Sequence, residues 1–242
     1  MNQEPRIRYT RVRKVKDLVR ANDGDAGLDF FFPEDITLKE LVEKQSDLMK
    51  YGITFYLEDL DTKDSTQYVM GDNKVYRPNI GYYSITPENL YDLYKKRVVG
   101  ISLKPQLRVL IPSGIRVLLE PKSSMLMAAN KSGIATKSGL IFGAEIVDSP
   151  YTGEVHVSLI NTSSDVVILK AGEKLVQFIH VPIYQTEPEE IPNGLYEEIA
   201  KGWGTRGDKG FGSSDKISEE LKLPLDYTVR MNYEDELNIR SY

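Results

Sequence analysis

The second half of the chain alternates short apolar runs with turn residues, a pattern typical of an all-β barrel or sandwich. The predicted strands span residues 108–111, 115–119, 125–129, 140–142, 155–159, 166–169 and 175–181. The turns predicted between them are Pro112-Ser113-Gly114, Glu120-Pro121-Lys122, Asp148-Ser149-Pro150 and Lys170-Ala171-Gly172. These assignments rest on the turn preferences of proline, glycine, serine and aspartate. The pattern therefore predicts an all-β domain.

Residues 39–100 break this rhythm. Apolar side chains recur at helical spacing over 38–49, and Thr86-Pro87-Glu88 has the N-cap threonine and first-turn proline of a helix start. Strand-like pieces lie between them at 53–57 and 67–70. We therefore expect a small α+β insertion at 39–100, inside a β domain formed by 1–38 and 101–200. The tail 216–242 is interpreted as an arm or as a partly disordered end.

Composition excludes several kinds of site. The 242 residues include no cysteine, which excludes disulfides, thiolate zinc sites and a cysteine nucleophile. With only two histidines, a histidine-rich metal site is excluded and a Ser-His-Asp triad is disfavoured. A formal charge of −5 gives no global reason to expect nucleic-acid binding. The six basic residues between Arg6 and Lys16 favour a first β-strand over a nucleic-acid arm.

The apolar runs also bear on location. None reaches the length of a membrane span, and the N-terminus has no signal-peptide core. We therefore expect no membrane contact, and the absence of cysteine is consistent with a cytoplasmic setting.

Residues 206–214 form the segment with the clearest chemistry. Its three glycines let the backbone approach a ligand. Arg206 and the hydroxyls of Ser213 and Ser214 suit phosphate oxygens, and Phe211, beside Gly212, offers a flat face to a base. We predict that 201–215 is a mobile segment that closes over a ligand. The alternative from these residues alone is a solvated linker with an incidental phenylalanine.

A second informative stretch, 143–154, runs from a strand into a tight turn with a carboxylate, a tyrosine and a glycine. With this stretch in place, the chain resembles the trimeric dUTPase family, which carries five ordered motifs. Their counterparts in chain order are 26–29 (Ala-Gly-Leu-Asp), 131–133 (Lys-Ser-Gly), 148–154, 172–177 (Gly-Glu-Lys-Leu-Val-Gln) and 206–214. The resemblance covers about 7–32 and 101–215.

The second motif has two candidates, Lys131-Ser132-Gly133 and Lys122-Ser123-Ser124. Ser132 precedes Asp148 by 16 residues, which leaves room for one strand and a hairpin turn. Ser123 precedes it by 25, and its segment separates two apolar runs in the manner of a hairpin tip. We therefore assign the motif to Lys131-Ser132-Gly133.

The resemblance implies a distorted jelly-roll or β-barrel fold, a homotrimer with active sites at subunit junctions, and Mg²⁺-assisted hydrolysis of dUTP to dUMP and pyrophosphate. In that scheme Asp148 is the general base that activates water, and Asp29 holds Mg²⁺ through water. The residues implied to bind substrate are Lys131, Ser132, Gly133, Ala144, Glu145, Ile146, Val147, Tyr151, Gln177, Arg206, Phe211, Gly212, Ser213 and Ser214. Read without the other motifs, Asp29 is also compatible with an aspartate that caps a turn.

The sequence departs from the family pattern in three places. Lys131 replaces the usual arginine, Lys209 stands where a further glycine is common, and Pro150 follows Ser149. None of these removes a reacting group. A dCTP deaminase, which shares the fold, is rejected because that enzyme needs a glutamate at the position of Ser158 and a phenylalanine at that of Tyr151.

A rival of another class is a dUTPase-fold binding or regulatory module whose insertion contacts a partner protein. The insertion carries tyrosines at 51, 56, 68, 76, 82, 83, 91 and 94, and aromatic residues are enriched at interfaces. A satellite core, or extra packing in a trimer, accounts for the same residues. A long insertion is also compatible with a viral origin, in which case the location would be the host cytoplasm.

Overall fold

The computed structural model describes residues 4–71, 74–84 and 86–203. The chain divides into two units, Met1–Thr186 and Glu187–Tyr242. In the second unit, the described residues form one helix, α4 (Asn193–Trp203). None of the helices in the described part of the chain is long and apolar enough to cross a membrane.

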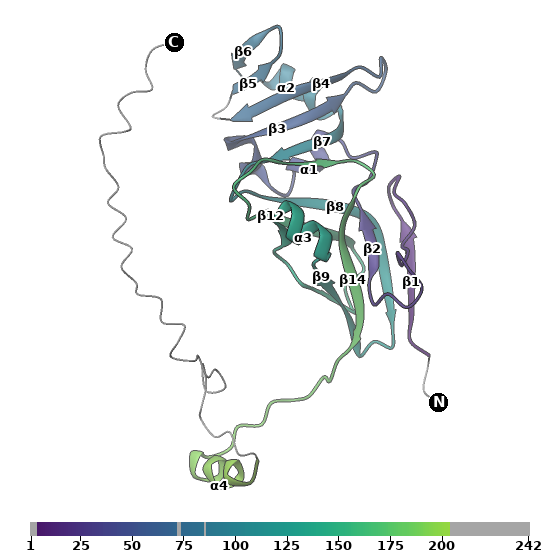
Figure 1. Cartoon of the computed structure of the whole chain (residues 1–242), viewed down its shortest axis with the longest axis vertical. Helices are drawn as coiled ribbons and strands as arrows, with labels where there is room; N and C mark the ends of the chain where they lie inside the picture. Colours follow the sequence, from purple (N-terminus) through teal and green to yellow (C-terminus); the bar gives the residue numbers. More distant parts are fainter. Residues whose placement is uncertain (1–3, 72–73, 85, 204–242) are drawn as a thin grey trace, which may run out of the picture. The chain divides into compact units, whose positions relative to one another are not determined.

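The first unit is built mainly of antiparallel strands (Figure 1). In chain order they are β1 (Arg6–Arg11), β2 (Leu28–Phe31), β3 (Tyr51–Glu58), β4 (Ser65–Gly71), β5 (Lys74–Arg77), β6 (Gly81–Ser84), β7 (Arg97–Leu103), β8 (Arg108–Glu120), β9 (Ser124–Ala129), β10 (Leu140–Phe142), β11 (Ile146–Asp148), β12 (Glu154–Asn161), β13 (Val167–Lys170) and β14 (Lys174–Pro182). Helices α1 (Leu38–Val42), η1 (Ser46–Lys50, a 3₁₀ helix), α2 (Pro87–Tyr94) and α3 (Ser132–Ser138) connect them.

These strands form three sheets. Their orders are β1-β8-β12-β10, β11-β9-β14-β2 and β13-β7-β3-β4-β5-β6. The prediction of an all-β fold is confirmed, and the described strands pair as open sheets rather than as one closed barrel. The third sheet joins the insertion to the β domain, because β7 pairs with β3 on one side and with β13 on the other.

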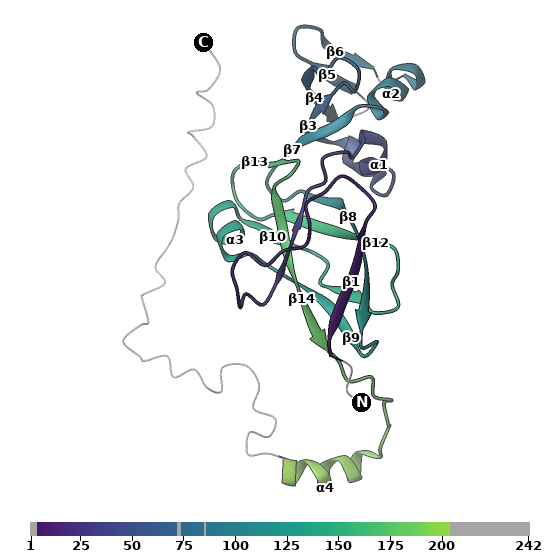
Figure 2. The ribbon, with the colours of Figure 1, turned by 90° about the vertical axis from the view of Figure 1, so that its right-hand side faces the viewer.

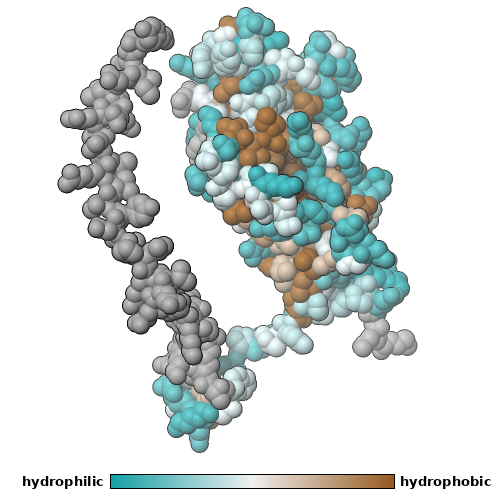
Figure 3. Space-filling view, in the orientation of Figure 1, coloured by the Kyte–Doolittle hydropathy of each residue, from teal (hydrophilic) through white to brown (hydrophobic). Residues whose placement is uncertain are grey.

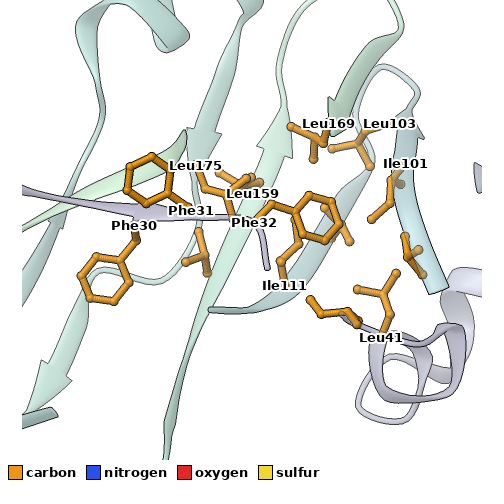
Figure 4. Packing of buried hydrophobic residues seen from close by; sticks show 14 of the residues in the cluster. Phe30, Phe31, Phe32, Leu41, Ile101, Leu103, Ile111, Leu159, Leu169 and Leu175 are labelled. Carbon is orange, nitrogen blue, oxygen red and sulfur yellow. The ribbon is translucent and has the colours of Figure 1, made fainter. Parts of the chain in front are cut away.

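The core is continuous across these sheets. Phe30 and Phe32 are fully buried, and the Phe30 ring lies 4.5 Å from that of Phe178, measured between centroids. Figure 4 shows Leu41 of α1 and Ile101 of β7 packed in the same cluster as Phe32. The insertion therefore shares its apolar interior with the β domain, where burial supplies most of the stabilisation.

The turn predicted at Pro112-Ser113-Gly114 is wrong, because residues 108–120 form one strand, β8. The glycine marks a β-bulge instead: the pairing of β8 with β12 shifts register between Glu154 and His156. Gly114 has φ +74°, a conformation that favours glycine, and a Cβ there would come within 3.0 Å of the Arg13 side chain. A bulge and a turn use the same residue types, so the local pattern could not separate them.

The hairpin predicted at Glu120–Ser123 is also wrong. Strand β8 pairs with β1 and β12, whereas β9 pairs with β11 and β14, so this connection passes from one sheet to another. Between Ser132 and Asp148 the prediction was one strand and a hairpin. The structure has helix α3, closed by Gly139 in the left-handed conformation, and then β10 and β11.

In the insertion, the helix predicted over 38–49 is split into α1 and η1. The Gln45 side chain donates to the carbonyl of Leu41 and also bonds both backbone groups of Leu110, which anchors the chain between the two helices. The helix start at Thr86 is confirmed, since its hydroxyl accepts the Asn89 N–H. The strand pieces at 53–57 and 67–70 lie within β3 and β4.

Candidate functional site

Three of the predicted motifs meet at Asp29. This residue lies on β2 directly opposite Gln177 on β14, and its side chain is almost completely buried. Lys131 Nζ donates to Asp29 Oδ1 at 2.6 Å. Lys174 Nζ lies 2.6 Å from Oδ2 in an ion pair. One buried carboxylate therefore faces two ammonium groups from different parts of the chain.

Charge balance at Asp29 is set by opposing effects. Burial disfavours the ionised carboxyl, but the hydrogen bonds and charges of Lys131 and Lys174 outweigh this, and the pKa of Asp29 is lowered. The second oxygen, Oδ2, is buried, and its close neighbour among the described residues is the Lys174 ammonium. Asp29 is thus ionised at neutral pH, with one lysine at each carboxylate oxygen.

Gln177 is held beside this carboxylate. Its Nε2 donates to the Asn130 carbonyl at 3.1 Å, and its backbone pairs with Ala129. A Cβ at Gly27 would lie 2.7 Å from Gln177 Oε1, so the glycine allows the amide to pack against the β2 segment. The predicted motif at 172–177 is therefore brought to those at 26–29 and 131–133.

Ser132 and Gly133 are exposed next to Lys131, at the start of α3. Lys131 is the N-cap residue of α3, but its side chain forms no capping hydrogen bond and donates to Asp29 instead. A Cβ at Gly133 would meet no heavy atom within 4 Å, so the space above the first turn is open. A ligand can approach these residues and the lysine together.

The turn 148–154 has its own set of contacts. The Tyr151 N–H donates to the Asp148 carbonyl at 3.0 Å, and the Tyr151 hydroxyl donates to the Glu154 carbonyl at 2.8 Å. Gly153 lies against the Tyr151 ring, where a Cβ would clash. Tyr151 remains 44% exposed, so part of its side chain is free to contact a ligand.

The segment before this turn is an edge. Strand β11 is the outermost strand of its sheet, paired only with β9 among the described residues. Ala144, Glu145 and Ile146 are exposed, Val147 is half-buried, and the Glu145 carbonyl accepts the Ala128 N–H. The outward backbone groups of β11 therefore have no strand partner in the described part of the molecule.

Within one chain, Asp148 does not join the Asp29 cluster. Asp148 on β11 pairs with Met125, near the start of β9. Gln177 on β14 pairs with Ala129, at the other end of β9. Four residues of strand correspond to roughly 14 Å. The predicted catalytic base and the predicted phosphate-binding residues thus lie at opposite ends of β9.

A family model described as dUTPase matches residues 87–215. The deoxyuridine 5'-triphosphate nucleotidohydrolase of Wolbachia pipientis subsp. Culex pipiens (strain wPip) is 36% identical over 127 residues, which cover 52% of this chain and 79% of that protein. The enzyme of the same name from Legionella pneumophila (strain Paris) is 30% identical over 118 residues, covering 48% of this chain and 73% of the relative.

The chain belongs to the dUTPase family.

The resemblance read from the motifs is therefore confirmed. Among solved structures, the dUTPase of Staphylococcus bacteriophage 80alpha with dUpNHpp matches with a TM-score of 0.50 and 16% identity, covering 87% of this chain and 98% of that one. At this identity the match bears on the fold alone. The family match at 87–215 includes every candidate motif except 26–29, which the structure itself brings to Lys131 and Gln177.

Two residues that contact the predicted motifs were not predicted. Lys174 lies inside the fourth motif, three residues before Gln177, and pairs with Asp29. Arg13 contacts Glu154 across 141 residues of sequence, and no local pattern announces such a contact. The predicted residues Arg206, Phe211, Gly212, Ser213 and Ser214 lie outside the described residues.

The fit of Mg²⁺ can be tested on the donor atoms present. In the described ranges no cluster of three or more histidine, cysteine, aspartate or glutamate side chains could hold a metal. Among the predicted residues that the structure describes, the candidate ligand is the Asp29 carboxylate, which Lys131 and Lys174 contact at 2.6 Å. One carboxylate fits an ion that arrives with substrate phosphates and keeps its waters, which is the usual manner of Mg²⁺.

Proposed function

We propose that the protein hydrolyses dUTP to dUMP and pyrophosphate. The observation that carries this proposal is the convergence of Asp29, Lys131 and Gln177 at one place, in a chain of the dUTPase family. These groups come from three motifs that are far apart in sequence. Their meeting supports a common task on one ligand, the triphosphate.

The phosphate groups would be held by Lys131, Ser132, Gly133 and Gln177. Lysine is a compact cation on a flexible stem, so Lys131 can turn from Asp29 toward a phosphate without a change in the backbone. Mg²⁺, when bound with the substrate, supplies neutralisation of the triphosphate charge. Asp29 would orient the waters of that ion through its carboxylate, which lies beside Lys131 and Lys174.

The uracil would lie against the backbone of Ala144–Val147, next to the free edge of β11. Unpaired N–H and C=O groups on an edge can bond the polar edge of a base as they would bond another strand. The exposed part of Tyr151 would pack under the deoxyribose and leave no space for a 2′-hydroxyl. A narrow pocket at the edge would also reject the methyl group of thymine.

Asp148 would act as the general base. Its backbone carbonyl accepts the Tyr151 N–H, which holds the turn, and the side chain is exposed and open to a water molecule. Asp148 would take a proton from that water as its oxygen attacks the α-phosphorus. The bond from the α-phosphorus to the α,β-bridging oxygen breaks, and pyrophosphate leaves.

A homotrimer with shared sites accounts for the separation along β9. If Asp148 of one subunit meets the Asp29 cluster of another, the roughly 14 Å between them in one chain no longer matters. Apolar side chains that are about half exposed, namely Leu118, Ile146, Val166 and Ile168, offer surface for such contacts. Figure 3 shows apolar patches on one face of the molecule, among hydrophilic surroundings.

The test of the reaction is pyrophosphate release from dUTP, dTTP, dCTP and UTP, in Mg²⁺ and then in EDTA. We expect release from dUTP alone, and only with the metal. Asp148→Asn should lower turnover by about 10²- to 10⁴-fold with dUTP binding nearly unchanged, measured by calorimetry with a non-hydrolysable analogue. Loss of binding in this variant would contradict the assignment of Asp148 as the base.

A binding or regulatory role of the insertion is the second candidate. It is favoured by the exposure of Tyr82 and Tyr91, at 75% and 62%, and by β6, which is the edge strand of its sheet among the described residues. If the folded oligomer releases pyrophosphate from none of the four nucleotides, this role replaces hydrolysis as the leading proposal.

A further inference from the structure

Arg13, two residues beyond β1, contacts both the insertion and the turn 148–154. Figure 2 shows the segment that follows β1 running toward α1, beside β8 and β12. We infer that Arg13 is a positioning residue that ties helix α1 to the turn carrying Asp148 and Tyr151, so that a displacement of α1 changes the geometry of that turn. The functional part of this inference rests on the proposed function.

The guanidinium divides its donors between two carboxylates. Arg13 Nε and Nη2 donate to Glu154 Oε1 and Oε2 at 2.8 and 3.2 Å, and Nη1 donates to Glu40 Oε1 at 2.7 Å. The side chains of Arg13 and Glu154 are 16% and 15% exposed. Because the guanidinium is planar and its donors have fixed directions, it cannot move with one carboxylate without disturbing the other.

Glu154 is the point where the turn is fastened. Its Oε1 also accepts the Gly114 N–H at 2.7 Å, which locks the β8 bulge to the first residue of β12. Its backbone carbonyl accepts the Tyr151 hydroxyl at 2.8 Å. The position of the Tyr151 ring, and through it the backbone of Asp148, therefore depends on where Arg13 holds Glu154.

Glu40 anchors the other end in the insertion. Its Oε2 accepts both the N–H and the hydroxyl of Thr37, which forms the capping box that begins α1. Burial opposes its ionisation, yet the bonds from Thr37 and Arg13 lower the pKa of Glu40 overall. The Glu40 carboxylate thus takes part in the capping box of α1 and also accepts a hydrogen bond from Arg13.

The test uses Glu40→Gln and Arg13→Lys. Glutamine serves in a capping box as well as glutamate, so Glu40→Gln removes the negative charge that faces Arg13 and keeps the helix start. Lysine keeps the charge at position 13 but has no fork. Matched controls are Glu58→Gln and Arg97→Lys, which alter an ion pair of similar burial, 2.7 Å long, between β3 and β7.

Two measurements decide the result. Amide hydrogen exchange over 148–154 and at Gly114 should be faster by about tenfold or more in both test variants and unchanged in the controls, since each 1.4 kcal/mol of lost protection is a factor of ten. The preference for dUTP over UTP, as a ratio of kcat/KM, should fall by up to about 100-fold, because Tyr151 is displaced.

The outcomes separate this inference from the proposed function. If amide exchange over 148–154 in Glu40→Gln and Arg13→Lys is as slow as in the control variants, the proposed role of Arg13 is wrong, whatever the activity. Faster exchange with an unchanged dUTP preference in an active enzyme also overturns its positioning role. If the wild-type protein does not hydrolyse dUTP, the proposed function falls, and the exchange result alone decides whether Arg13 ties α1 to the turn.

Discussion

Two ion-pair clusters in this molecule have opposite compositions. At one, the buried carboxylate of Asp29 faces two lysines, whose side chains are 22% and 38% exposed. At the other, the guanidinium of Arg13 faces the carboxylates of Glu40 and Glu154. The first has surplus positive charge on flexible stems near the surface, which suits an anionic substrate. The second has a rigid fork between two elements, which suits a joint. The flexibility of the cationic side chain therefore decides whether a cluster can release its partners.

Removing the guanidinium from the Arg13 cluster should have the largest effect on the free energy of unfolding. Arg13→Met leaves two carboxylates close together without their cation, and removal of one partner from a buried pair typically destabilises a protein by about 3–5 kcal/mol. We expect a loss near the lower end, since Glu40 is 38% exposed. The free energy of unfolding in urea measures it. A change below about 1 kcal/mol would mean that this cluster is an ordinary surface pair.

Breaking the Asp29 cluster should affect activity more than stability. Lys131→Gln should lower kcat/KM for dUTP by about 10²- to 10³-fold, as for loss of one preorganised electrostatic donor. Its stability should change little, because Lys174 still faces Asp29. Lys137→Gln, on the exposed last turn of α3, is the matched control and should leave activity unchanged. Equal losses in the two variants would contradict a specific role for Lys131.

Substitutions at the two candidate serines test where the second motif, and with it the phosphate-binding site, lies. Ser132→Ala should reduce kcat/KM by roughly ten- to a hundredfold, because hydrogen bonds to charged groups contribute about 1.5–3 kcal/mol. Ser123→Ala should be nearly silent, since that serine is exposed and it is its backbone carbonyl that accepts the Ile183 N–H. Steady-state kinetics of both variants measures the contrast, and the reverse result would move the second motif to Lys122-Ser123-Ser124.

Lowering the pH should produce the smallest change in stability, and the change should differ between the Asp29 and Arg13 clusters. The pKa of Asp29 is lowered in the folded protein, so its contribution to stability is complete above the unfolded value near 3.9. It is lost as pH falls further, through the folded value. Glu40 behaves in the same direction but is more exposed. Urea midpoints between pH 7 and 3 should therefore fall less in Asp29→Asn than in the wild type, and parallel curves would assign the acid response to other carboxylates.

The resemblance to the dUTPase motifs, and not local pattern alone, led to residues 131–133 and 172–177. The structure brings Lys131 and Gln177 from these motifs to Asp29. The helix start at Thr86 was predicted because a cap is decided within four residues. The features that were not predicted depend on contacts between residues far apart in the sequence. The bulge at Gly114 depends on Glu154, and a turn signal alone cannot report that partner.

The insertion leaves and rejoins the β domain at a single place. Thr37 and Arg97 form a β-bridge, and the Val98 N–H donates to the Ile36 carbonyl at 2.8 Å. The intervening segment is therefore a loop whose ends are already closed by backbone hydrogen bonds. Since the entropy of closing a loop grows only with the logarithm of its length, doubling it adds about 0.6 kcal/mol. The length of this segment can therefore change at little entropic cost, because its ends are held by the contacts at Thr37 and Val98.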